Sequence, residues 1–176
     1  MKWVRIPSPA PNTMKEKFKQ AFMDVAKRFA ELSYAKRLHV GAIIVKDDRI
    51  ISIGYNGMPS GWENDCETVE FMLNNGNPID YPLFGKFWVE GIEVETHYRL
   101  VTKPEVLHAE TNAIAKLAKS NESGENASLF VTHAPCLNCA ILIYQTGIKN
   151  VYYGEKYRDI SGINFLQKSG VTVEKV

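Results

Sequence analysis

From residue 108 to its end, the chain alternates between segments of two kinds. Some have apolar residues at helical spacing, and others are short runs rich in β-branched and aromatic residues. Helices are expected over residues 108–119, 135–146 and 160–168, and strands over residues 128–132, 151–154 and 171–174. Elements that alternate in this way favour right-handed βαβ units and a sheet with helices on both faces. The pattern therefore predicts an α/β fold.

The N-terminal part adds three elements. Apolar positions between Phe18 and Leu32 recur at helical spacing, which predicts one long helix that ends near Ala35. Two β-branched runs follow at residues 41–45 and 50–53, and the charged residues between them predict a hairpin. Because 176 residues suit one domain, we expect all of these elements to share a single core.

Residues 57–105 interrupt this order. The segment lacks a regular hydrophobic period and contains several prolines and glycines, but it also contains many aromatic side chains. A flexible linker would not carry so many aromatic residues. We therefore interpret it as an ordered but irregular insertion within one domain of residues 1–176, with a short helix around residues 68–73.

Charge and hydrophobicity restrict the class of protein. The formal net charge is only +1, which argues against a large contact with a nucleic acid polymer. No apolar run approaches the length of a membrane span, and residues 1–17 lack the apolar core of a signal peptide, so we expect a cytoplasmic protein. In that reducing compartment, the three cysteines favour metal binding or catalysis over disulfide formation.

Two of the cysteines lie in the sequence HAPCLNC at residues 133–139. Pro135 suits the first position of a helix, which would place Cys136 and Cys139 on one face of its first turn. The positive end of a helix dipole lowers the pKa of a thiol there, and a divalent metal lowers it further. The motif therefore predicts two thiolate ligands for a metal ion.

A histidine and a glutamate stand two residues apart in the sequence HAE at 108–110. They cannot share one side of a helix, since each residue turns it by about 100°, but both can address a point beyond its first turn. We expect His108 to be the third ligand of a zinc ion whose fourth position stays open for water. Such a site lowers the pKa of water to roughly 7, and Glu110 would take up the proton and return it elsewhere.

Each motif alone has other interpretations. A CxxC pair is also typical of a redox dithiol or of a closed structural zinc site, for which His133 is the local candidate as fourth ligand. An HxE triplet is nearly uninformative by itself. The two motifs together, at the starts of two helices in a βαβ context, favour a catalytic zinc.

At these motifs the chain resembles the zinc-dependent cytidine and deoxycytidylate deaminase superfamily. The sequences VGAIIV, GYNGMPSG, LHAETNAI, PCLNCA and QTGIKNVYY, in this order, are most similar to the deoxycytidylate deaminases within it. The resemblance extends from Leu38 to the C-terminus without the insertion. It implies a three-layer α/β/α fold with a mixed five-stranded central sheet, and hydrolysis of dCMP to dUMP and ammonia, which supplies the precursor of dTMP.

The resemblance also implies roles for individual residues. Glu110 corresponds to the proton shuttle, which protonates N3 of cytosine and then carries a proton to the departing amino group. The family's zinc ligands fall on His108, Cys136 and Cys139. The backbone N–H of Ala109 would hold the carbonyl of the base, and further contacts with the nucleotide fall on Asn56 and Tyr157. The alternatives are that Asn56 is a turn residue and Tyr157 an ordinary half-buried aromatic residue.

Two properties of some relatives carry over only in part. A second, structural zinc is not expected, because only Cys66 and His97 lie near the corresponding regions. Many relatives are hexamers that dCTP activates and dTTP inhibits through a site near the GYNG loop, which is present here at residues 54–57. The resemblance therefore implies a homo-oligomer, with dCTP and dTTP as candidate effectors.

Three rival functions stay open. A cytidine or deoxycytidine deaminase would share the zinc chemistry but would need no cation for a phosphate, for which Lys156 and Arg158 are candidates here. A tRNA adenosine deaminase is disfavoured by the low net charge. A non-catalytic nucleotide sensor that is stabilised by its metal would have no need of Glu110.

Overall fold

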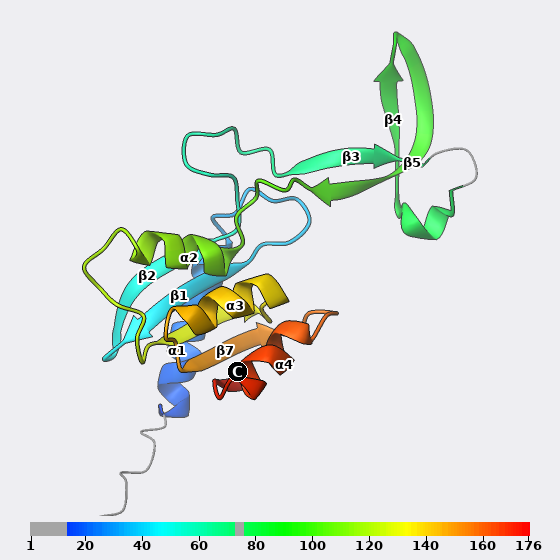
Figure 1. The fold of residues 1–176 in the computed structure, drawn as a ribbon. Coiled ribbons are helices and arrows are strands. Elements are labelled where there is room, and N and C mark those ends of the chain that lie inside the picture. The colour runs from blue at the N-terminus through cyan, green and yellow to red at the C-terminus, as the bar shows by residue number, and fades with distance from the viewer. Residues whose placement is uncertain (1–13, 73–75) are drawn as a thin grey trace, which may run out of the picture.

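The computed structural model describes residues 14–72 and 76–176 (Figure 1). Five strands form the central sheet, in the order β2-β1-β6-β7-β8. Their bounds are β1 Gly41–Lys46, β2 Arg49–Tyr55, β6 Ser128–His133, β7 Asn150–Glu155 and β8 Thr172–Lys175. Strand β1 pairs antiparallel with both β2 and β6, whereas β6, β7 and β8 are parallel. The mixed five-stranded sheet is therefore confirmed.

Helices cover both faces of this sheet. Within the described residues they are α1 Glu16–Ala30, α2 Ala109–Leu117, α3 Leu137–Gln145 and α4 Ser161–Lys168. Helix α1 lies on one face, over a buried cluster that includes Met23 and Ile43. Helices α2, α3 and α4 lie on the other face, over a cluster that includes Ile44. Ile43 and Ile44 belong to different clusters because successive side chains of a strand point to opposite faces. The predicted three-layer α/β/α fold is confirmed.

Helix α1 ends earlier than the apolar spacing predicts. Its last residue is Ala30 rather than one near Ala35. The amide of Ser33 still donates to the carbonyl of Ala30, but the Ser33 hydroxyl donates to the carbonyl of Asn56 at 2.8 Å. This bond to the end of β2 directs the chain away from the helix axis and toward β1.

The insertion has regular secondary structure, so the interpretation of it as irregular is wrong. The expectation of a short helix at residues 68–73 is also wrong. The described residues of the insertion, which do not include residue 73, form β3 Glu67–Phe71, β4 Leu83–Val89, β5 Ile92–Thr102 and a 3₁₀ helix, Pro78–Asp80. The three strands make an antiparallel sheet in the order β3-β5-β4, which projects from the α/β core (Figure 1). The alternation is hard to see in the sequence because apolar residues stand on both faces of β4.

None of the helices in the described part of the chain is long and apolar enough to cross a membrane. The expectation that residues 1–17 are not a signal peptide falls mostly outside the described residues, which begin at residue 14.

Candidate active site

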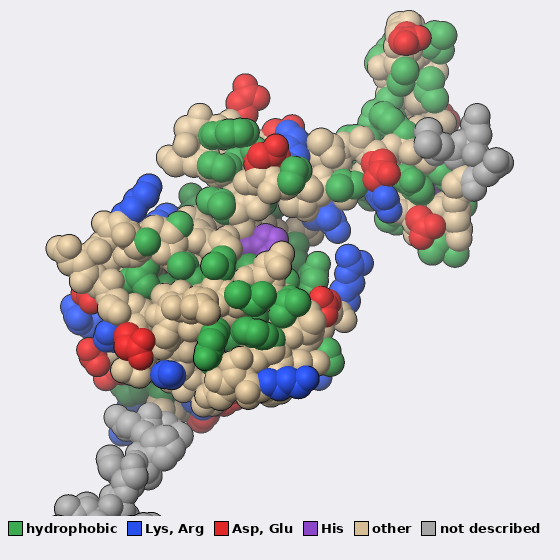
Figure 2. Space-filling model, in the orientation of Figure 1, with side chains coloured by type: hydrophobic (Ala, Val, Ile, Leu, Met, Phe, Trp, Pro, Cys, Tyr) green, Lys and Arg blue, Asp and Glu red, His purple; other side chains and the backbone are tan. Residues whose placement is uncertain are grey.

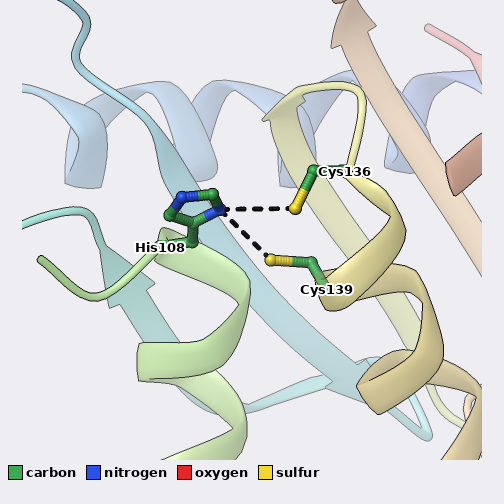
Figure 3. Close-up of side chains that lie close together, drawn as sticks. All are labelled: His108, Cys136 and Cys139. Atoms are coloured by element: carbon green, nitrogen blue, oxygen red, sulfur yellow. Dashed lines mark hydrogen bonds between the residues drawn. The ribbon is translucent and has the colours of Figure 1, made fainter. Parts of the chain in front are cut away.

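The N-termini of α2 and α3 meet in space, and the residue before each helix points toward the other helix (Figure 3). His108 is the N-cap of α2 and Cys136 is the N-cap of α3, and neither side chain caps its own helix. Instead, Nδ1 of His108 lies 3.6 Å from Sγ of Cys136 and 3.3 Å from Sγ of Cys139. The structure therefore brings together the three side chains expected to bind zinc.

Helix α3 begins two residues later than predicted. Pro135 precedes the helix, and the first helical residue is Leu137. Cys136 and Cys139 thus occupy the N-cap and N3 positions rather than two positions of the first turn. Side chains at N-cap and N3 lie close enough to bond each other's backbone in many helices, so the two sulfurs still face one point.

The separations of these atoms suit a tetrahedral zinc. A nitrogen ligand at about 2.0 Å and a sulfur ligand at about 2.3 Å from zinc stand about 3.5 Å apart. The three ligand atoms all lie within 4.8 Å of one another, and they form the one such group of His, Cys, Asp or Glu among residues 14–72 and 76–176. His133 is not part of it, although this residue lines the neighbouring cavity. Three ligands fit one catalytic zinc with an open fourth position.

The protein itself favours a thiolate at this place. Hydrogen bonds from Cys139 and then from His108 lower the pKa of Cys136 to about 4. The hydrogen bond between the two cysteines raises the pKa of Cys139, and burial raises it further. The hydrogen bond to Cys136 also raises the pKa of His108. Without a metal, Cys136 is therefore the sulfur that favours the thiolate, which is the state that binds metal.

Two glycines let the elements approach closely enough to form this group. A Cβ atom at Gly54 of β2 would overlap the carbonyl oxygen of Ala109 and stand 2.6 Å from the amide nitrogen of Ala113. A Cβ atom at Gly162 of α4 would overlap the carbonyl oxygen of Pro135. Any larger residue at either position would therefore push one of the two N-caps out of place.

A cavity of about 340 Å³ opens beside the metal-binding group. This volume lies in the range of small-molecule sites. His108, Ala109 and Glu110 line it together. The Glu110 side chain is only 4% exposed, and burial raises the pKa of its carboxyl group. A carboxyl group at the cavity wall with a raised pKa takes up a proton more readily than an exposed one, as a proton shuttle must.

The three residues expected to contact the nucleotide all line this cavity. They are Asn56, Ala109 and Tyr157. The amide of Val40 donates to Oδ1 of Asn56 at 2.8 Å, and Nδ2 of Asn56 donates to the carbonyl of Leu38 at 2.8 Å. Asn56 therefore holds a wall of the cavity in place, and one N–H of its amide group stays available.

Arg37 also lines the cavity, and no pattern in the sequence indicates it. Its Nη1 atom donates to Oγ1 of Thr102 at 3.1 Å, across 65 residues of the chain. Its backbone N–H donates to the carboxylate of Glu67 at 3.3 Å. Glu67 and Thr102 begin β3 and end β5, and both line the cavity, so the base of the insertion forms part of its wall.

The remaining candidates lie elsewhere. Neither Lys156 nor Arg158 is among the lining residues, and the Arg158 guanidinium lies 6.0 Å from the ring centre of Tyr157. Cys66 is buried at the start of the insertion, whereas Nδ1 of His97 lies 3.2 Å from the carbonyl oxygen of Tyr81. In the described part of the chain these two residues do not form a metal-binding group.

The sequence and the fold are similar to those of known proteins. Residues 16–155 match the family model described as the cytidine and deoxycytidylate deaminase zinc-binding region. The deoxycytidylate deaminase of Enterobacteria phage T4 is 38% identical over 131 residues, which are 67% of this chain and 67% of the phage protein. The deoxycytidylate deaminase of Saccharomyces cerevisiae is 32% identical over 163 residues, which are 92% of this chain but 46% of the yeast protein.

A solved structure is similar over nearly the whole chain. The dCMP deaminase from the cyanophage S-TIM5, in complex with dCMP and dUMP, has a TM-score of 0.73 and 41% identity over 93% of this chain and 100% of that one. The family match spans most of the sequence, and it contains the three ligands and Glu110. The chain therefore belongs to the cytidine and deoxycytidylate deaminase family.

Proposed function

We propose that this protein is a zinc-dependent enzyme that hydrolyses dCMP to dUMP and ammonia. The observation that carries the proposal is the placement of a buried carboxyl group, Glu110, and a three-ligand metal group on one cavity. The choice of substrate is supported by the deoxycytidylate deaminases of phage T4 and yeast, and by the cyanophage enzyme in complex with dCMP and dUMP.

In the proposed reaction, water adds to C4 of cytosine and the amino group leaves the same carbon. A zinc ion held by His108, Cys136 and Cys139 would supply Lewis-acid chemistry that brings the pKa of water at its open position near neutrality. Glu110 takes one proton from the attacking water and delivers it to N3. It then moves the second proton to the amino group, so that ammonia departs and C4 keeps the oxygen as a carbonyl.

The backbone and neighbouring side chains would orient the base and sugar. Ala109 is the first residue of α2, where the amide groups have no partner within the helix, so its N–H is free to bind the carbonyl of the base. The remaining amide N–H of Asn56 would donate to the sugar. Tyr157, which is 36% exposed at the cavity wall, would pack against the nucleotide.

Arg37 is our candidate for the phosphate. It is the one Lys or Arg residue among the residues that line the cavity, and Thr102 uses only one of its five N–H groups. A guanidinium group can bind phosphate oxygens with two parallel hydrogen bonds. This assignment replaces Lys156 and Arg158 as the first choice for a cation that distinguishes dCMP from deoxycytidine.

We further propose a cytoplasmic homo-oligomer, a hexamer by resemblance to the family, with dCTP and dTTP as effectors near residues 54–57. A reducing compartment would keep Cys136 and Cys139 as thiols, whereas oxidation would remove two metal ligands. The resemblance is the support for the hexamer and for the effectors.

Ammonia release from a panel of substrates tests this function. The panel holds dCMP, deoxycytidine, dCTP and a tRNA, and the zinc content of the enzyme is measured beside it. We expect one zinc per chain and a kcat/KM for dCMP at least about tenfold above that for deoxycytidine, since one charge-assisted contact contributes about 1.5–3 kcal/mol. A preference for deoxycytidine would contradict the substrate, and no ammonia from any compound would favour the nucleotide sensor.

A further inference from the structure

One wall of the cavity is a segment without helix or strand. Residues 35–40, here called the wall segment, lie between α1 and β1, and four of these six residues line the cavity. A segment of this kind has no ladder of its own, so its position depends on hydrogen bonds from other elements. The Asn56 side chain holds its C-terminal half, at the backbone of Leu38 and Val40.

Glu67 holds the N-terminal half of the wall segment. Its two carboxylate oxygens accept from the backbone N–H of Lys36 at 3.0 and 3.2 Å, and Oε1 also accepts from the backbone N–H of Arg37 at 3.3 Å. Glu67 is only 5% exposed. A buried carboxylate needs such bonds, and bonds to an ionised acceptor are stronger than those between neutral groups. The backbone of Arg37 is therefore firmly placed by the first residue of β3.

Thr102 holds the side chain of the same arginine. Nη1 of Arg37 donates to Oγ1 of Thr102 at 3.1 Å. Glu67 and Thr102 stand opposite each other in the pairing of β3 and β5, so one cross-strand pair holds both ends of Arg37. Among the described residues, no ion pair joins Arg37 to a carboxylate. Its positive charge is thus held in place without being neutralised.

The base of the insertion is itself tied to the core. Gly57 and Leu107 exchange two backbone hydrogen bonds of 3.1 and 2.9 Å, and the N–H of Lys103 donates to the carbonyl of Cys66 at 2.9 Å. Leu107 directly precedes the metal ligand His108. Figure 2 shows a histidine in the hollow where the insertion joins the core, with Lys or Arg side chains beside it. The base of the insertion and the metal group therefore belong to one connected framework.

We propose that Glu67 is a positioning residue that holds Arg37 at the cavity, so that the insertion takes part in selecting a phosphorylated substrate. This inference rests on the proposed function, in which Arg37 binds the phosphate of dCMP. An arginine side chain loses rotamer freedom when it binds a ligand, and a side chain that is already held loses less. Glu67 acts on the backbone and Thr102 on the guanidinium, so each lowers this cost.

The charge of Glu67 alone would have the opposite effect on the substrate. A carboxylate at the cavity wall repels a phosphate. Glu67→Gln removes that charge, so electrostatics by itself predicts a lower KM for dCMP. The amide nitrogen of glutamine cannot accept a hydrogen bond, so the variant also loses part of its hold on Lys36 and Arg37. The positioning role predicts a higher KM, and the direction of the change separates the two effects.

Steady-state kinetics of the zinc-loaded full chain with dCMP and deoxycytidine test the proposal. We expect Glu67→Gln to raise KM for dCMP about 3- to 10-fold, with kcat changed by less than about twofold. The value of kcat/KM for deoxycytidine should change by less than about twofold, since that substrate has no phosphate. Glu70→Gln is the matched control. Glu70 lies on the same strand but pairs with Arg99 at 2.8 Å and does not line the cavity, so both substrates should keep their values.

A double-mutant cycle separates positioning from a general structural role. In an Arg37→Ala background, Glu67→Gln should have no further effect on dCMP, because the side chain that it positions is gone. Thr102→Val is a second variant that keeps a β-branched residue in β5, and it should also raise KM for dCMP. Thr68→Val, at a position of β3 that does not line this cavity, is its control and should leave KM unchanged.

Three results would overturn the positioning role alone. They are a lower KM for dCMP in Glu67→Gln, an equal effect of Glu67→Gln with and without Arg37, and a dCMP-specific loss in Arg37→Ala that neither Glu67→Gln nor Thr102→Val shares. Equal losses for dCMP and deoxycytidine in Glu67→Gln would also overturn it, in favour of a general role in stability. If Arg37→Ala shows no dCMP-specific loss, the phosphate assignment of the proposed function fails, and this inference fails with it.

Discussion

The Nδ1 atom of His108 lies 3.3 Å from Sγ of Cys139, although the two residues are 31 positions apart and lie at the starts of different helices. Helix α2 is placed by its close contact with Gly54 of β2, and the loop before α3 is placed by Gly162 of α4. The metal group is thus assembled by the packing of separate elements. Changes that shift either helix should affect metal binding before they unfold the chain.

Cys139→Ser should release zinc. A hydroxyl group does not ionise at neutral pH as a zinc-bound thiol does, and two ligands hold the ion poorly. We expect zinc affinity to fall at least about 100-fold, since the loss of a group that merely orients a ligand already lowers it 10- to 100-fold. Zinc content after dialysis against a competing chelator measures the effect. Cys66→Ala, which removes the buried cysteine outside the group, should keep its zinc; equal retention by Cys139→Ser would refute the ligand assignment.

Glu110→Gln should keep zinc and the fold but lose turnover. The amide has nearly the shape of the carboxyl group but cannot accept and return a proton, so we expect kcat for dCMP to fall by about 10² to 10⁴. Steady-state ammonia release and zinc analysis on the same sample separate the two effects. Glu105→Gln alters a carboxylate that does not line this cavity, and its kcat should match that of the unchanged enzyme. A Glu110→Gln enzyme with normal kcat would exclude the shuttle role.

Gly54→Val should weaken both metal binding and stability. The added side chain would overlap the backbone of α2 at Ala109, directly after the ligand His108. Overpacking of this kind typically lowers the free energy of unfolding by about 1–3 kcal/mol. Urea unfolding and zinc titration of the same variant measure the two losses. Gly57→Ala is the control, because a Cβ atom there meets nothing within 4 Å. Unchanged zinc affinity in Gly54→Val would show that α2 is not held through this contact.

Arg37→Ala should raise KM for dCMP without a comparable effect on deoxycytidine. Loss of a charge-assisted contact with phosphate, worth about 1.5–3 kcal/mol, corresponds to about 10- to 100-fold in kcat/KM. Parallel kinetics with the two substrates isolate the phosphate from the base and the sugar. Lys156→Ala removes a cation that does not line the cavity and should leave both values unchanged. Equal losses for both substrates would mean that Arg37 supports the cavity wall rather than the phosphate.

Local patterns were sufficient for the central sheet. Strand β1 has five consecutive buried residues, Gly41 to Val45, and β6 is buried through five of its six, so both stand out as apolar runs. The helices between the parallel strands show their period for the same reason, because burial on one side selects apolar residues every third or fourth position. The end of α1 was predicted less well, since the bond from Ser33 to Asn56 depends on the position of β2.

The insertion shows where such patterns fail. Phe84 and Trp88 lie on the same face as Lys86 and Glu95, so one face of β4 mixes apolar and charged residues and the two-residue period is obscured. A strand that no other layer covers within the described residues is under weaker selection for clean alternation. This is why residues 57–105 looked irregular although half of their described part is strand.

By itself, the sequence determined which atoms can bind the metal and that they stand at two helix starts, because ligand type and spacing within one turn are local properties. It also determined the order of strands and helices around the core. Only the tertiary structure decided that the base of the insertion walls the cavity, that Arg37 lines it while Lys156 and Arg158 do not, and that the insertion forms a separate three-stranded sheet. These features depend on contacts between residues far apart in the chain, which no local period records.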